Sequence, residues 1–164
     1  AFSTKRLFIH KAGSKTEKLN LIQQINNGNM DLESCNIHTI ASTLMHFLKH
    51  LRSPLLPNKD VVENINEKIQ FYQCLNLVKY LANENRDTLM YLIGFFQQMV
   101  NYEKTTMVSI QSIADKFALK VAIPPHENMS ADEIKQFSNR VSRFLSLLIS
   151  EWITEDVYPG FEDD

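Results

Sequence analysis

Apolar residues recur along most of the chain at the three- and four-residue intervals of an amphipathic helix. The strongest stripe lies over residues 37–51 and consists of Ile37, Ile40, Ala41, Leu44, Leu48 and Leu51. Pro54 ends this predicted helix, because the residue before a proline is pushed out of the helical conformation. Two more stripes predict a long helix over 85–101 and another near 110–117. Their apolar members are Leu89, Leu92, Ile93, Phe96 and Val100, then Ile110, Ile113, Ala114 and Phe117.

Two capping signals mark where other helices begin. Ser14 and Glu17 have the S-x-x-E spacing of a capping box, in which the hydroxyl accepts a free backbone N–H and the carboxylate reaches back. A helix is therefore predicted over 15–27, and Gly28 follows it where a helix end favours positive φ. Ser130 starts a second such box, ahead of a helix carrying Ile134, Phe137, Val141, Leu145, Leu148 and Trp152.

The remaining pattern completes an all-α prediction. Shorter helices are predicted over 60–68 and 71–81, and a proline-containing loop over 122–128. No segment shows the alternation typical of a strand. The chain therefore predicts a single-domain helical bundle of about seven helices packed by ridges into grooves. The domain is expected over 1–152, with a solvated acidic tail over 153–164.

Composition narrows the function classes. The 164 residues are 44% hydrophobic, which suits one domain with a sizeable core. The charged fraction is 22% and the net charge is −2, which argues against disorder and against a general nucleic-acid binder. No apolar run approaches the roughly 18 residues of a membrane span. Cys35 and Cys74 are predicted to be free thiols in a reducing, cytoplasmic setting.

No self-contained catalytic or metal motif is present in the sequence. His46 and His50 share a predicted helix face, as zinc ligands can, but Phe-Leu-Lys separates them and supplies no base. They are interpreted as surface or boundary histidines. Neither G-x-S-x-G, H-E-x-x-H nor a Walker-type loop occurs. We therefore expect no cofactor, no metal and no enzyme in its own right.

Four segments, in order, resemble the GTPase-activating domain of regulators of Rho-family small GTPases, the RhoGAP family. They are residues 7–14 (LFIHKAGS), 40–57 (IASTLMHFLKHLRSPLLP), 81–92 (LANENRDTLMYL) and 113–119 (IADKFAL). The resemblance runs from Leu7 to Trp152. It implies an all-α RhoGAP-like bundle and a Rho/Rac/Cdc42-type GTPase as partner.

The resemblance also implies a missing catalytic group. Members of that family insert an arginine from the first loop into the GTPase site, and such a finger accelerates hydrolysis about 10³–10⁵-fold. This corresponds to roughly 4–7 kcal/mol of transition-state stabilisation. Alignment on Gly13 places His10 at the arginine position. Histidine is shorter and lacks the bidentate fork of arginine.

Other positions of the family pattern differ as well. The helix lysine of the family falls on Met45, the helix arginine on Lys49 and the later asparagine on Lys120, while Leu7 replaces the glycine before the finger. The family's opening helix has no counterpart, so either the chain is trimmed or this member lacks it. A shifted loop would present Lys11 or Arg6 in place of His10.

Three functions follow as hypotheses. The first is a RhoGAP-like module without catalysis, which binds a Rho-family GTPase or another protein through His10, Lys11, Met45, Lys49, Lys116, Lys120 and Val121. The second is an active GTPase activator that uses Lys11 or Arg6. The third is an architectural interaction domain of a larger cytoskeletal or cell-division protein, whose other domains set any cytoskeletal or membrane association.

Overall fold

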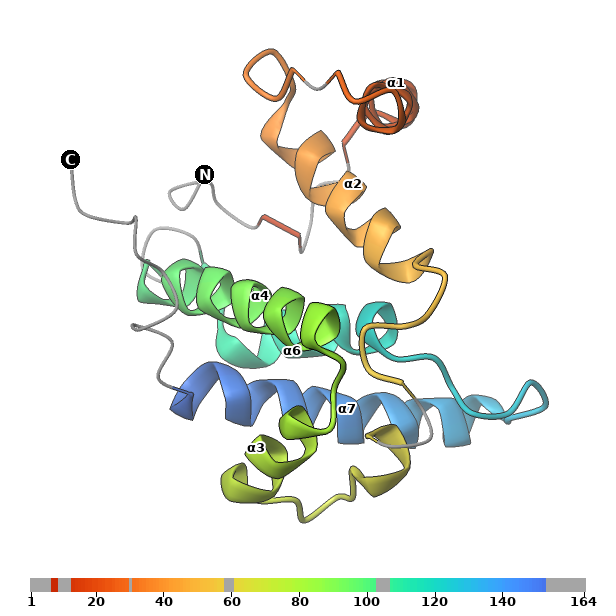
Figure 1. The fold of residues 1–164 in the computed structure, drawn as a ribbon, viewed down its shortest axis with the longest axis vertical. Coiled ribbons are helices and arrows are strands. Elements are labelled where there is room, and N and C mark those ends of the chain that lie inside the picture. Colours follow the sequence, from red (N-terminus) through yellow and green to blue (C-terminus); the bar gives the residue numbers. More distant parts are fainter. Residues whose placement is uncertain (1–6, 9–12, 30, 58–60, 103–106, 153–164) are drawn as a thin grey trace.

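The computed structural model describes residues 7–8, 13–29, 31–57, 61–102 and 107–152. Within these ranges the chain forms six α-helices and one 3₁₀ helix, with no strand (Figure 1). This confirms the predicted all-α class. In chain order the elements are α1 (Lys15–Asn26), α2 (Ile37–Lys49), η1 (Val62–Asn64), α3 (Phe71–Lys79), α4 (Asn83–Asn101), α6 (Ile110–Val121) and α7 (Ala131–Glu151).

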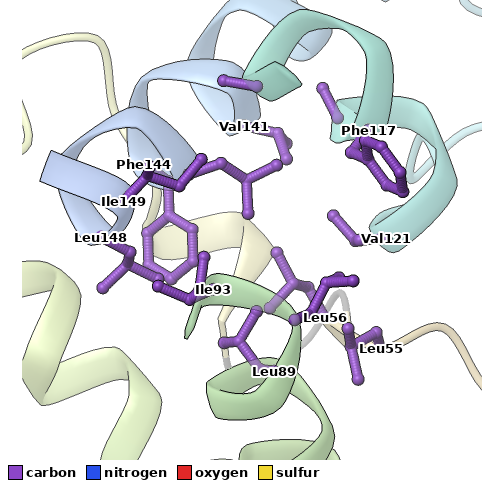
Figure 2. Close-up of a cluster of buried hydrophobic side chains, with 14 of the residues drawn as sticks. Leu55, Leu56, Leu89, Ile93, Phe117, Val121, Val141, Phe144, Leu148 and Ile149 are labelled. Carbon is purple, nitrogen blue, oxygen red and sulfur yellow. The ribbon is translucent and has the colours of Figure 1, made fainter. Parts of the chain in front are cut away.

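The core is built around α6 and α7, which pack along each other. Helix α4 packs on both, and α3 packs on α7. Side chains from α4, α6, α7 and the segment 55–56 point toward one another in this core (Figure 2). The rings of Phe96, Phe117 and Phe144 have no exposed surface. Fully burying one such side chain contributes about 1.5–3 kcal/mol, so these three rings together stabilise the fold by several kcal/mol.

Helices α1 and α2 extend to one side of this core (Figure 1). α2 packs on α6, and α1 packs on α2. The Ser14 hydroxyl accepts one of the free amides in the first turn of α1, that of Glu17, at 3.4 Å. The Glu17 carboxylate does not complete the predicted capping box. It instead accepts a hydrogen bond from the Thr39 hydroxyl of α2 at 2.8 Å, which ties the two helices together.

The end of α1 is a glycine-dependent helix stop, as predicted. Gly28 has a φ of +70°, a backbone conformation that glycine adopts without steric penalty. Its amide donates to the carbonyl of Ile25 and the next amide, of Asn29, donates to the carbonyl of Gln24, both at 3.0 Å. These two bonds satisfy carbonyls that the helix end would leave unpaired.

The predicted helix over 60–68 is wrong. In the described part of that segment the only helical turn is η1. The Asn66 side chain accepts the amide of Lys68 at 2.9 Å, a local bond that competes with helix formation. The apolar residues of the segment nevertheless reach the core; they are Val61, Val62, Ile65 and Ile69. Their helix-like spacing reflects burial in a turn-rich connection.

Other boundaries are close to prediction. The Ser130–Glu133 capping box is present in full at the start of α7. α4 begins at Asn83, two residues earlier than predicted. α2 ends at Lys49, so Leu51 lies beyond the helix and is 40% exposed, although the stripe placed it on the buried face.

Candidate functional site

The residues just before the first loop are fixed in the core. Leu7 and Phe8 are both buried. The Phe8 ring meets that of Phe117 edge-to-face, with ring centroids 5.0 Å apart, and that of Phe95 at 6.2 Å. Phe8 also has a φ of +70°, which is rare for a bulky side chain. Its packing between α4 and α6 therefore holds a backbone conformation that is unfavourable on its own.

The residue just after the loop is fixed to α2. The amide of Gly13 donates to the Ser42 hydroxyl at 3.2 Å. A Cβ at this position would overlap the backbone of Thr39, so only glycine permits so close an approach. Phe8 on the core and Gly13 on α2 are thus the described residues that flank the sequence segment 9–12. His10 and Lys11 within it, and Arg6 before it, lie outside the described residues.

Three lysines of α2 and α6 form a basic cluster. Lys49 and Lys116 are exposed, and Lys120 is partly buried. Burial lowers the pKa of the Lys120 ammonium, and the nearby charges of Lys49 and Lys116 lower it further. The structure therefore brings together three of the residues that the sequence predicted for partner binding.

Two other predicted residues have different positions. Met45 is partly buried and packs against the core. Val121 is fully buried, and its carbonyl accepts the amide of Leu56 at 2.8 Å. The side chain of Val121 therefore has no surface for a partner, and the expectation that it lines a binding surface is corrected: it belongs to the core.

Apolar side chains beside the lysines were missed by the sequence reasoning. Leu51 follows α2 and is 40% exposed, while Leu119 of α6 is 37% exposed and Ile123 is 47% exposed. Each lies within three residues of Lys49 or Lys120 in the sequence. The available signal was that Leu119 falls off the apolar stripe of its own helix. Exposed apolar groups among charges are typical of protein–protein contact surfaces.

A side-chain clamp fixes the chain between α2 and the core. The Asn85 amide donates to the carbonyls of Pro54, at 3.3 Å, and Leu55, at 3.0 Å. The side chains of Leu55 and the next residue, Leu56, are buried in the core. This clamp, which the sequence reasoning did not identify, sets where the C-terminal end of α2 lies relative to α6.

The two histidines predicted to lie at a surface or boundary do so. His46 is partly buried and His50 is exposed, and their rings stack with centroids 4.1 Å apart. Within the described ranges, no group of three potential metal ligands includes them. The described helices include none that is long and apolar enough to span a membrane.

The described part of the site thus consists of basic and apolar side chains on α2, on α6 and in the residues that directly follow each helix. Such a surface suits an acidic protein partner, because complementary charge steers encounter and apolar contacts add affinity. Lys49, Lys116 and Lys120 supply the charge.

Comparison with known proteins agrees with this architecture. The RhoGAP domain family model matches residues 2–126. Human Rho GTPase-activating protein 18 is 29% identical over 116 residues, covering 67% of this chain and 18% of that protein. The Drosophila melanogaster Rho GTPase-activating protein conundrum is 28% identical over 143 residues, covering 76% of this chain and 22% of that protein.

A solved structure shares the fold. The crystal structure of human Rho GTPase activating protein 15 superposes with a TM-score of 0.78 at 21% identity, covering 93% of this chain and 75% of that one. The chain spans about a fifth of the length of the two relatives above. With its four matching segments, its helical bundle and a family match over most of its length, the chain belongs to the RhoGAP domain family.

Proposed function

We propose that this domain binds a Rho-family small GTPase through the basic cluster of α2 and α6, and that it does not supply a catalytic arginine. Membership of the RhoGAP family supports the partner class. The names of the relatives, which are Rho GTPase-activating proteins, support it as well.

The lysine cluster is the observation that carries the proposal. In the free domain the positive charges of Lys49 and Lys116 repel that of Lys120, whose charged form is already disfavoured by burial. An acidic partner surface would offset this repulsion on binding. The exposed Leu51, Leu119 and Ile123 would then be covered in the same contact. The surface is therefore better suited to a complex than to free solvent.

The absence of catalysis rests on the residue at the finger position. A finger must neutralise charge on the transferring phosphoryl group, which an arginine does with a permanent charge and a planar fork. His10 offers neither at neutral pH. Met45, at the family's lysine position, is packed against the core and carries no charge. Both the finger and one of its supporting cations are therefore replaced.

Direct binding tests this proposal. Rho, Rac and Cdc42 are loaded with a non-hydrolysable GTP analogue or with GDP, and the dissociation constant is measured by titration calorimetry. We expect nucleotide-dependent binding that weakens at least about tenfold in the double variant Lys49→Glu/Lys120→Glu. Lys68→Glu/Lys79→Glu is the matched control, because it makes the same change of net charge at two exposed lysines outside the basic cluster.

Each contrary result has a definite meaning. Binding of no GTPase in either nucleotide state would leave the architectural hypothesis. Equal weakening by Lys68→Glu/Lys79→Glu would show that net charge, not the basic cluster, controls the affinity. Acceleration of hydrolysis by the wild-type domain would favour an active GTPase activator that uses Lys11 or Arg6.

A further inference from the structure

Two histidines lie side by side at the C-terminal end of α2, next to the basic cluster. The His46 and His50 rings stack at 4.1 Å with an interplanar angle of 27°. The His50 Nδ1–H donates to the carbonyl oxygen of His46 at 2.8 Å. The same carbonyl also accepts the backbone amide of His50 at 3.1 Å, so the ring bond holds the imidazole against the last helical turn. The Nε2 atom of His50 is not used by that bond.

The surroundings of the pair are basic on each packed element. The charges of Lys18 of α1 and Lys49 of α2 both lower the pKa of His46. The charge of Lys49 also lowers the pKa of Lys120 of α6. Lys116 joins the cluster from α6. The acidic residue of α1 that contacts α2 is Glu17, whose carboxylate accepts a hydrogen bond from the Thr39 hydroxyl.

The histidine pair therefore continues the basic cluster from α6 across the end of α2 toward α1. We infer that an acidic segment of the GTPase crosses the end of α2 and contacts His46 and His50 together with Lys49, so that binding tightens as the pH falls from 7.5 to 6. This inference rests on the proposed function, since it concerns the same partner. Histidine is the side chain whose ordinary pKa lies in this interval.

The direction of the effect follows from the charges. In the free domain, burial lowers the pKa of His46 below its ordinary value of 6.5, and the neighbouring His50, Lys18 and Lys49 lower it further, so the His46 ring is neutral at pH 7.5. Carboxylates placed against the pair raise that pKa in the complex. Complex formation then takes up protons, and by linkage the affinity rises as the pH falls through the pKa of the complex.

The size of the effect is set by the change in pKa. A rise of one unit in one histidine corresponds to a limiting tenfold gain in affinity. Over the interval from pH 7.5 to 6 we expect the dissociation constant to fall about three- to tenfold for the wild-type domain.

The experiment compares pH profiles at constant ionic strength. The dissociation constant for a GTPase loaded with a GTP analogue is measured at pH 7.5, 6.75 and 6 for wild type and for His46→Gln/His50→Gln. Because the same GTPase is used, its own titration contributes equally. The double variant should lose the tightening at low pH, whereas His126→Gln, at an exposed position of the loop after α6, should keep it.

A second variant separates loss of charge from loss of structure. His50→Lys places a permanent charge at an exposed position, so it should bind at pH 7.5 more tightly than wild type and show a shallower pH profile. Calorimetry in two buffers of different ionisation enthalpy should show greater proton uptake by wild type than by the double variant.

Two results overturn the inference, and they are distinguishable. Parallel pH profiles of wild type and the double variant, with binding still dependent on Lys49, would overturn the inference and leave the proposed function intact. Failure of the wild-type domain to bind any GTPase at any of the three pH values would overturn both.

Discussion

The side-chain amide of Asn85, at the start of α4, donates hydrogen bonds to the backbone carbonyls of Leu55, at 3.0 Å, and of Pro54, at 3.3 Å. These partners lie about thirty residues earlier, in the turn that leads from α2 into the core. One side chain therefore fixes the turn that carries the basic end of α2. The position of the proposed binding surface depends on this long-range contact as well as on helix packing.

Replacing Asn85 by alanine should destabilise the domain. Both carbonyls would lose a donor in a partly buried setting, which costs about 1–3 kcal/mol. Asn85→Asp should do the same, because a carboxylate cannot donate to a carbonyl. Chemical denaturation monitored by circular dichroism measures the change. Asn76→Ala, at an exposed position of α3, is the control and should change the free energy of unfolding by less than about 0.5 kcal/mol. Equal effects of the two alanine variants would contradict the clamp.

Gly13→Ala should weaken both folding and partner binding. The added Cβ would lie within 2.5 Å of the Thr39 amide nitrogen, so the loop end and α2 must separate. Such overpacking costs about 1–3 kcal/mol. Gly28→Asn is the comparison, because nothing lies within 4 Å of that site and asparagine tolerates positive φ. Denaturant unfolding should show a larger loss for Gly13→Ala. A smaller loss than for Gly28→Asn would contradict the close approach.

Lys120→Gln should make the free domain more stable at pH 7. The folded state lowers the pKa of Lys120, so the unfolded state binds more protons. The stability of the wild-type domain therefore rises as the pH approaches 10.5, the ordinary pKa of a lysine. The advantage of the variant should therefore be greatest at neutral pH and shrink as the pH approaches that value. It should stay below about 1 kcal/mol, because solvent screens the group. Lys79→Gln is the exposed control. An equally large gain in stability in that variant would contradict the idea that repulsion within the basic cluster destabilises the free domain.

The two cysteines should differ in reactivity. Cys74 is fully buried in α3, and burial raises the pKa of its thiol to about 12. Cys35 is partly exposed, with its Sγ–H donating to the Asp31 carbonyl at 3.2 Å. A thiol-specific chromogenic reagent at pH 8 should therefore titrate one cysteine in the native domain and two in denaturant. Cys35→Ser should abolish the native reaction, and persistence of a fast native reaction in that variant would show that Cys74 is accessible.

Local sequence signals predicted the local structure well. The Ser130–Glu133 capping box and the glycine stop at Gly28 depend on neighbours within five residues, and both are present. The apolar stripe of α2 likewise predicted its helix, and the family resemblance predicted the bundle.

Long-range contacts explain what the sequence could not predict. The Glu17 carboxylate accepts a hydrogen bond from Thr39 of α2 and does not cap its own helix. The Asn85 amide donates to a turn about thirty residues earlier in the chain. Val121 and Lys120 are adjacent in sequence, yet one is buried and the other reaches solvent. The contacts of α6 with α7 and α2 decide which face of the helix is covered. The lysines could be found from charge and alignment, and the shared helix face of His46 and His50 from their spacing, but the position of this pair near Lys18 of α1 required the folded arrangement.

Single-turnover GTP hydrolysis by Rho, Rac and Cdc42, with the domain in excess, tests the central claim most directly. We predict that the wild-type domain binds a GTP-loaded GTPase at saturation without accelerating hydrolysis. His10→Arg should accelerate hydrolysis, but by less than the 10³–10⁵-fold of a fully supported finger, because Met45, Lys49 and Lys120 also differ. Clear acceleration by wild type that disappears on replacing Lys11 or Arg6 would contradict the account and identify an active GTPase activator.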